Sequence, residues 1–359
     1  MQLRVISGCA WLAGALAVAA DGNLPLQQNF EPLYREALER RERLLGPDHP
    51  KTAESLTNLA LLLRKRGDFA AAEPLLRRAL SIDEKTFGKE DVRIATDLDN
   101  LGSVLAETGA RDSAEPLYRR SLAITEKALG KSHLEVAGSL QKLASLLEDK
   151  GESAAAEPLY RRAISIQEAA LGPEDSAVGI SLNNLALLLA NAGNYDAAEP
   201  LYRRALAIDE KAFGPDHPEV GAVLENLATL SQARGNSVEA EPLFRRALAI
   251  YHKALGPDHA QVAAVLNKLA VLLKARGDLR GAEQVVRRSL TIAENAFGSN
   301  DPEVAKQSIN LAWLLNARGD YRGAQALYRQ ALPIAEKNLG PNDPLVQAIR
   351  KALTEIENR

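Results

Sequence analysis

The stretch that decides the fold is residues 198–214, with the sequence AEPLYRRALAIDEKAFG. A closely similar run occurs four more times, at residues 72–88, 114–130, 156–172 and 240–256. Within the run, Ala198, Tyr202 and Ala205 follow the three- and four-residue spacing of one face of a helix. The pattern therefore predicts an amphipathic helix that returns every 42 residues.

Glycines recur at the same 42-residue interval. One series is Gly46, Gly88, Gly130, Gly172, Gly214, Gly256, Gly298 and Gly340. A second series lies 21 residues after members of the first, at Gly67, Gly109, Gly151, Gly193, Gly235, Gly277 and Gly319. Because a helix that ends and reverses needs a residue that adopts positive φ at no steric cost, we expect these glycines to cap helix C-termini.

Each repeat therefore predicts a hairpin made of a first and a second helix. Counting gives seven hairpins from His49 to Leu339, preceded by a lone second helix at 30–45 and followed by a lone first helix at 345–358. The expected fold class is all-α, with sixteen helices. No hairpin can bury its apolar face alone, so we expect residues 29–359 to stack as one array without an internal domain boundary.

Two repeated positions carry a resemblance to a known family. A leucine followed by Ala or Gly marks each first helix, at Leu59, Leu101, Leu143, Leu185, Leu227, Leu269 and Leu311. A small residue marks each second helix, at Ala72, Ala114, Ala156, Ala198, Ala240, Ala282 and Ala324. With the 42-residue length, residues 29–358 resemble tetratricopeptide repeats of the kinesin light chain type, a variety also common in bacterial proteins. The resemblance implies a right-handed superhelical solenoid of stacked antiparallel helix pairs.

The same resemblance implies a protein–protein interaction scaffold, which binds a peptide or protein partner in a concave groove lined by the first helices. In the family, the position before the leucine–small pair points into this groove. That column is Asn58, Asn100, Lys142, Asn184, Asn226, Lys268 and Asn310. Asparagine amides can pair with the backbone of an extended peptide, and the lysines can attract its carboxylates. The alternative is that the asparagines only bridge neighbouring helices.

Trp313 stands three residues beyond Asn310 and is the only tryptophan outside the first twenty residues. A large amphipathic ring near one end of a groove is a candidate anchor for a partner. It could equally pack between repeats. The sequence leaves both interpretations open.

Residues 1–20 differ from the rest of the chain. Arg4 precedes an apolar run that ends in small residues before Asp21, which is typical of a secretory signal peptide followed here by a linker at 21–28. We therefore expect an exported protein, periplasmic or secreted, without membrane insertion after the signal is removed. Residues 6–9 also resemble a lipidation signal at Cys9, although only eight residues precede that cysteine. The alternative is a cytoplasmic regulatory adaptor that controls a partner enzyme and has no signal peptide.

The charges of the chain are balanced. The formal net charge is -3, with acidic and basic residues mixed throughout, so the sequence has no electrostatic signature of a nucleic-acid-binding protein. The single cysteine, Cys9, lies in the expected signal peptide, which excludes a disulfide in the mature chain. We expect a monomer, a protein or peptide partner, and no cofactor.

Two motifs could suggest chemistry. Four histidines, His49, His133, His217 and His259, occupy one position of the connector between hairpins. Residues at one position of successive repeats lie about 10 Å or more apart, too far to share a metal, so we expect turn and cap roles. The connectors also carry helix start signals. In Asp216–Glu219, an N-cap carboxylate at Asp216 comes before an early-turn proline and a capping-box glutamate, and Ser132 with Glu135 repeats this arrangement. The run at 130–132 ends like a phosphate loop but lacks its upstream glycine. Neither motif indicates an enzyme.

Arginine pairs also repeat, at 77–78, 119–120, 161–162, 203–204, 245–246 and 287–288. Glutamates such as Glu84 and Glu126 lie further along the same helices. We expect a ladder of exposed ion pairs. The alternative is a surface that attracts an acidic partner.

Overall fold

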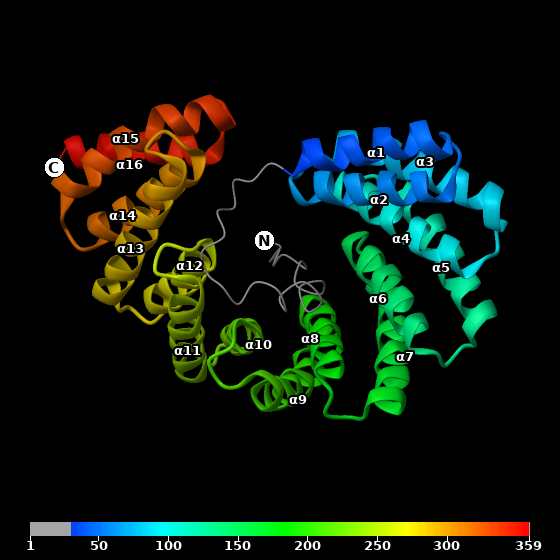
Figure 1. Ribbon diagram of the computed structural model, residues 1–359. Coiled ribbons are helices and arrows are strands. Elements are labelled where there is room, and N and C mark those ends of the chain that lie inside the picture. The colour runs from blue at the N-terminus through cyan, green and yellow to red at the C-terminus, as the bar shows by residue number, and fades with distance from the viewer. Residues whose placement is uncertain (1–29, 359) are drawn as a thin grey trace. The chain divides into compact units, whose positions relative to one another are not determined.

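The computed structural model describes residues 30–358, and it separates into two compact units at Asn194 and Tyr195. The expected signal peptide and the expected linker at 21–28 both lie outside the described residues. Each unit is built of α-helices alone within the described range (Figure 1). The sixteen helices and the all-α fold expected from the sequence are thereby confirmed.

The first unit holds eight of these helices. They are α1 (Glu31–Leu45), α2 (Pro50–Lys65), α3 (Phe69–Phe87), α4 (Val92–Glu107), α5 (Arg111–Leu129), α6 (Leu134–Asp149), α7 (Ser153–Leu171) and α8 (Ser176–Asn191). The second unit holds α9 (Tyr195–Phe213), α10 (Pro218–Ala233), α11 (Ser237–Leu255), α12 (Ala260–Ala275), α13 (Leu279–Phe297), α14 (Pro302–Ala317), α15 (Tyr321–Leu339) and α16 (Pro344–Glu357). We call the even-numbered helices A helices and the odd-numbered ones B helices. The boundary falls between the A and B helices of one hairpin, and the expectation of an unbroken array stays a prediction.

Helix ends follow the repeat. All fifteen glycines of the two series have positive φ, between 78° and 97°, as the C-cap prediction requires, and no other described residue has positive φ. At the other end, the N-cap prediction is wrong by one residue. The cap of α10 is His217, whose Nδ1 accepts from the backbone N–H of Glu219 at 3.3 Å, and not Asp216. His133 caps α6 in the same way in place of Ser132, because the residue directly before the first helical turn is the one with extended backbone.

The histidine column therefore has the capping role that the sequence favoured. His49 and His259 accept from the backbone at 3.1 and 3.2 Å. Other A helices use aspartate in the same place, such as Asp91 before α4 and Asp301 before α14. A neutral imidazole nitrogen and a carboxylate oxygen are both acceptors, so they are interchangeable here.

Packing within each unit explains the repeated small residues. The seven repeated alanines of the B helices, from Ala72 to Ala324, are each 0% exposed, because a larger side chain would separate the helices that meet there. Successive helices pack against each other, and α2 also contacts α4, as α4 contacts α6 and α10 contacts α12. The A helices of these neighbouring hairpins therefore lie side by side.

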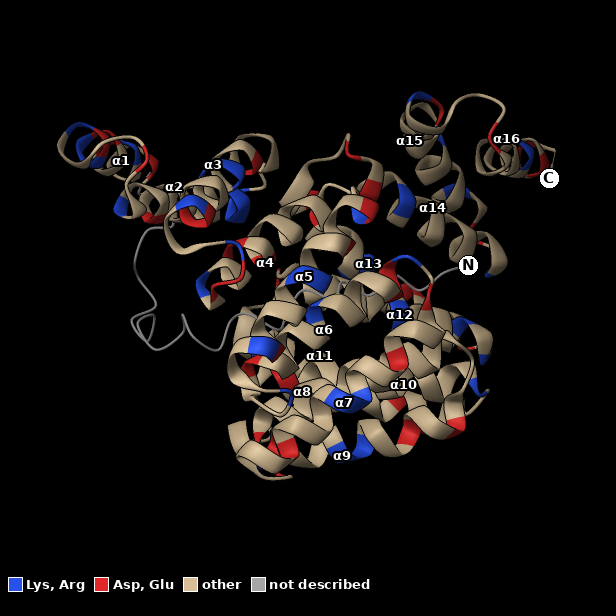
Figure 2. Ribbon diagram, turned by 90° about the vertical axis from the view of Figure 1, so that its right-hand side faces the viewer, with Lys and Arg blue, Asp and Glu red and all other residues tan. Residues whose placement is uncertain are grey.

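The second arginine of several pairs joins neighbouring hairpins. Arg78 donates from Nη1 to Glu42 at 2.6 Å and from Nη2 to the carbonyl of Pro47 at 3.0 Å. The same bond, which we call the Arg clamp, recurs as Arg120–Glu84, Arg162–Glu126 and Arg246–Glu210. The expected ion-pair ladder is confirmed, with one difference: each glutamate belongs to the preceding B helix. Acidic and basic residues accordingly occur together along the helices in Figure 2.

The clamp is interrupted in the second unit. At the position of its glutamate stands His252, which is exposed near the end of α11. Among the ion pairs of residues 30–358, none is formed by the corresponding Arg288. The repeat is thus less regular toward its C-terminal end.

Candidate protein-binding site

A pocket of about 480 Å³ lies on the A-helix surface of the second unit, between α12, α14 and α16. Its walls are apolar: Val271 is 57% exposed, Trp313 42% and Leu345 40%. Tyr328 from α15, which is buried, also lines the pocket. Large apolar side chains left open in one concave place are typical of a ligand site.

The helical repeat positions these residues. On α12, residues Asn267, Val271 and Lys274 are four and three positions apart and share one face, and on α14 Asn310 and Trp313 do the same. Val271 and Trp313 occupy the same position of consecutive repeats, 42 residues apart. Val271 and Trp313 give the pocket its apolar wall at a position that holds Ser103, Ser145 or Thr229 in three other repeats and the half-buried Leu61 and Leu187 in the remaining two.

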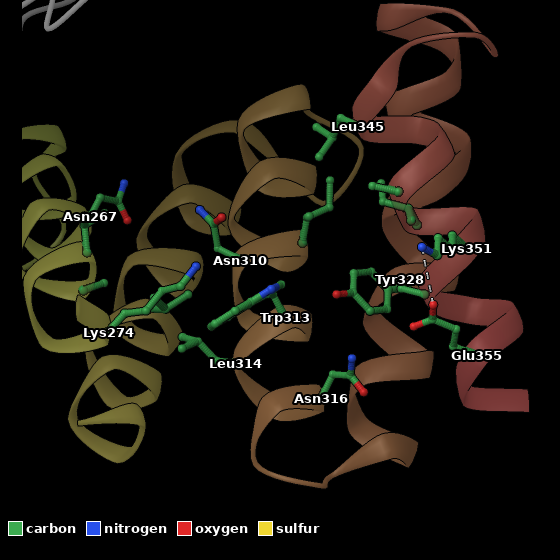
Figure 3. A pocket seen from close by; sticks show the side chains of 17 residues that line it. Asn267, Lys274, Asn310, Trp313, Leu314, Asn316, Tyr328, Leu345, Lys351 and Glu355 are labelled. Atoms are coloured by element: carbon green, nitrogen blue, oxygen red, sulfur yellow. Dashed lines mark ion pairs between the residues drawn. The ribbon is translucent and has the colours of Figure 1, made fainter. Parts of the chain in front are cut away.

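Polar groups surround the apolar wall. Lys274 places its ammonium 3.4 Å from the centre of the Trp313 ring, a cation–π contact visible in Figure 3. On α16, Lys351 lies 3.8 Å from Glu355. The lining also includes the amides of Asn267, Asn310 and Asn316. These amides can donate to and accept from a peptide backbone.

The pocket brings together two of the residues predicted for the groove, Asn310 and Trp313. Asn310 is exposed, and the ring of Trp313 is open to solvent on the A-helix surface. Sequence reasoning missed the α16 wall, where Leu345, Ala348 and Ala352 are exposed or half-buried. Their spacing of three and four residues along α16 was the available signal.

The other predicted residues are distributed differently. Asn58 is exposed, whereas Asn100 and Asn184 are half-buried and Asn226 is only 8% exposed. Both lysines of the column are held by acids of the preceding A helix. Lys142 is bonded to Asp99, and Lys268 to Glu225 at 2.6 Å.

These two ion pairs change the expected role of the lysines. Asp99 is 7% exposed and Glu225 is 5% exposed, so each lysine neutralises a nearly buried carboxylate. A partner carboxylate would have to compete with that internal acid. Lys274, which has no acid among its contacts with the described residues, is a better candidate for attracting a negative group.

Three buried carboxyl groups were not expected from the sequence. Burial raises the pKa of Asp209 on α9 to about 7, and Glu219 adds to the effect. Burial likewise raises the pKa of Asp97 on α4 to about 7, with the neighbouring Asp83 as the next cause. On α6, burial raises the pKa of Glu148 to about 7, against hydrogen bonds from Tyr160 and Asn191.

These acids lie at different helix contacts. Asp83 and Asp97 lie at the α3–α4 contact, and Asp209 lies on α9, the helix packed against α10. No group of three or more metal-ligating side chains occurs within residues 30–358. The residues that line the pocket are the candidate site.

None of the described helices is long and apolar enough to cross a membrane. The sequence profile of the family Tetratricopeptide repeat matches residues 31–85, 92–169, 178–251, 219–295 and 264–337. No curated protein matches the sequence.

Solved structures share the fold. BtubC (BKLC) from P. vanneervenii is 26% identical, with 65% of this chain and 91% of that chain covered and a TM-score of 0.54. A putative kinesin light chain with nearly identical TPR-like repeats from Podosopora anserina is 27% identical, with 57% and 97% covered and a TM-score of 0.52. A STAND protein with a tetratricopeptide repeat sensor, PH0952 from Pyrococcus horikoshii, is 18% identical, with 91% of this chain and 46% of that chain covered and a TM-score of 0.66. At this identity the likeness supports the fold alone. The chain belongs to the tetratricopeptide repeat family.

Proposed function

We propose that the chain is a protein-interaction scaffold, not an enzyme, and that its partner is a peptide or protein segment held on the A-helix surface. Tetratricopeptide repeat proteins generally bind protein partners. The observation that carries the proposal is the pocket between α12, α14 and α16, with its exposed Trp313 and Val271 beside three amides. An apolar side chain of the partner would enter the pocket while the amides pair with its backbone.

Rigidity of the repeats supports this mechanism. The pocket residues project from the helices α12 to α16 and not from loops, so little ordering accompanies binding on the side of the scaffold. A short peptide that fills one pocket of this size should bind with modest, micromolar affinity. A longer partner that contacts more A helices would bind more tightly.

Peptides selected from a displayed random library against the purified chain provide a test. We expect Trp313→Ala to weaken the selected peptides by about thirtyfold, because loss of a central tryptophan contact costs about 2 kcal/mol. The control is Val238→Ala on α11, a 78% exposed apolar residue outside the pocket. Equal affinities for the wild type, W313A and V238A would show that the pocket is not the binding site.

We also propose export, on the sequence of residues 1–20 alone. Cell fractionation with N-terminal sequencing is the test. A mature chain that begins at residue 20 or 21 and is found outside the cytoplasm is expected. An uncleaved cytoplasmic chain would favour the regulatory adaptor.

A further inference from the structure

Helix α1 exposes an apolar face that the later B helices bury. Tyr34 is 39% exposed, whereas Tyr118, at the same position of α5, is 5% exposed. Phe30 and Leu33 are 49% and 60% exposed. The cause is position: within the described residues no A helix precedes α1, which packs against α2 and is bonded to α3 through Glu42 and Arg78. We call Phe30, Leu33, Tyr34, Ala37 and Leu44 the α1 face.

Helix α16, the last described helix, differs from α1 in its outer face. In α14, the positions Ala305, Ser308, Ala312 and Leu315 are buried against neighbouring helices. The corresponding positions of α16 are the exposed polar residues Gln347, Arg350, Thr354 and Glu357. Repeat arrays need polar outer faces on their terminal helices to stay in solution. Helix α16 has this polar face and α1 does not.

One exposed residue of α1 has no counterpart in the repeat. Leu44 is 70% exposed, and the equivalent position in the later B helices is Thr86, an alanine or Asn338. A leucine at this position adds apolar surface that a stacked hairpin does not use. The α1 face therefore exposes more apolar surface than an uncovered B helix of the ordinary repeat sequence would expose.

The exposed charges of α1 form a self-complementary pattern. Glu36 and Glu39 come before Arg40 and Arg43 along the helix, and all four are exposed. The described ion pairs of α1 involve other residues, such as Arg35 with Glu31 and Arg41 with Glu54. When two copies of such a helix pack antiparallel with their midpoints together, residue 36 of each copy lies opposite residue 40 of the other, so Glu36 meets Arg40.

We propose that the α1 face is the interface of a homodimer, in which the two α1 helices pack antiparallel and Glu36 faces the partner's Arg40. The two-fold symmetry makes this contact occur twice. A helix of fifteen residues is about 22 Å long, which gives an interface at the small end of the range for specific complexes. We expect a dissociation constant of about 10 µM. The inference replaces the expectation of a monomer and is independent of the peptide pocket.

Sedimentation velocity of the purified full chain over about 1 to 200 µM tests the dimer, because that range spans the expected dissociation constant. Leu33→Glu should leave the chain monomeric throughout. Val238→Glu, which places the same charge on another exposed apolar residue, should not change the dissociation constant. Circular dichroism of each variant confirms that the helices are intact.

Charge reversal identifies the contact itself. Glu36→Arg alone and Arg40→Glu alone each place like charges opposite one another twice and should weaken the dimer by about tenfold or more. Mixing the two variants restores opposite charges at both contacts, so the mixture should form heterodimers about as tight as the wild-type dimer.

Three results would overturn the proposal. The first is a wild-type chain that stays monomeric at every concentration, as expected if another part of the chain or a different protein covers α1. The second is a Leu33→Glu variant that still dimerises. The third is a mixture of the two charge variants that associates no better than either variant alone.

Discussion

Replacing Asp209 by Asn should remove a pH-dependent loss of stability from the second unit. The Asp209 side chain belongs to a residue that is 1% exposed, and its Oδ1 has no hydrogen-bond partner among the described residues. Burial raises the pKa of this carboxyl from its ordinary value of 3.8 to about 7. Because one pKa unit corresponds to about 1.4 kcal/mol, ionising the buried group lowers the free energy of unfolding by up to about 4 kcal/mol.

The sign of the effect follows from which state binds the proton more tightly. The pKa is higher in the folded chain, so the folded chain holds the proton more tightly than the unfolded chain does. The resulting stabilisation is complete below about pH 4 and is lost as the pH rises through about 7. Asparagine cannot ionise, and the variant therefore lacks this dependence.

Urea unfolding of the wild type and D209N between about pH 5 and pH 8 measures the difference. The variant carries its own pH-independent cost of about 1–3 kcal/mol, because its buried amide also lacks partners. The test is therefore the slope: relative to the wild type, the variant should gain about 2–4 kcal/mol over this range. Unfolding free energies that stay parallel at every pH would refute the reasoning. The control is Asp216→Asn. The difference in unfolding free energy between this variant and the wild type should not change with pH over this range, since the hydrogen bond from Lys253 lowers the pKa of Asp216.

Two further predictions concern packing and the Arg clamp. Gly102→Ala should lower the free energy of unfolding of the first unit by about 1–3 kcal/mol in urea, since the new Cβ would lie 2.9 Å from Tyr118. The control Gly138→Ala meets open space and should raise that free energy by about 0.5–1 kcal/mol, so equal effects of the two substitutions would contradict this account. His252→Glu should restore the clamp to Arg288 and raise the free energy of unfolding by about 0.5 kcal/mol at low salt, and a gain that persists in 1 M salt would exclude an ion pair as its cause.

Much of the fold could be predicted because the 42-residue repeat appears at the positions where backbone conformation and packing allow the fewest residue types. The glycines with positive φ and the alanines at 0% exposure tolerate few other residues, so their spacing reveals the C-terminal ends of the helices and the places where helices meet closely. The N-caps were misplaced by one residue, as at His217, because two adjacent polar residues are both plausible caps until the backbone angles are known.

The candidate site was less accessible to sequence reasoning. The column from Asn58 to Asn310 was identified by position, but burial differs along it, from exposed Asn58 to nearly buried Asn226. That difference depends on the side chains of neighbouring hairpins, as when Glu225 lies next to Asn226 and holds Lys268. Such contacts reach across 43 residues, and a pattern within one repeat does not contain them.

The Arg clamp has a consequence for how such a chain evolves. Each hairpin that carries both the glutamate and the arginine can be joined to any other hairpin of the same kind, as Arg78–Glu42 and Arg120–Glu84 illustrate. Duplication or deletion of a whole 42-residue block then creates a junction that is already bonded, so the array can grow or shrink by recombination without new compensating mutations. A block such as the one bearing His252 would lose this freedom of exchange and keep its place in the order.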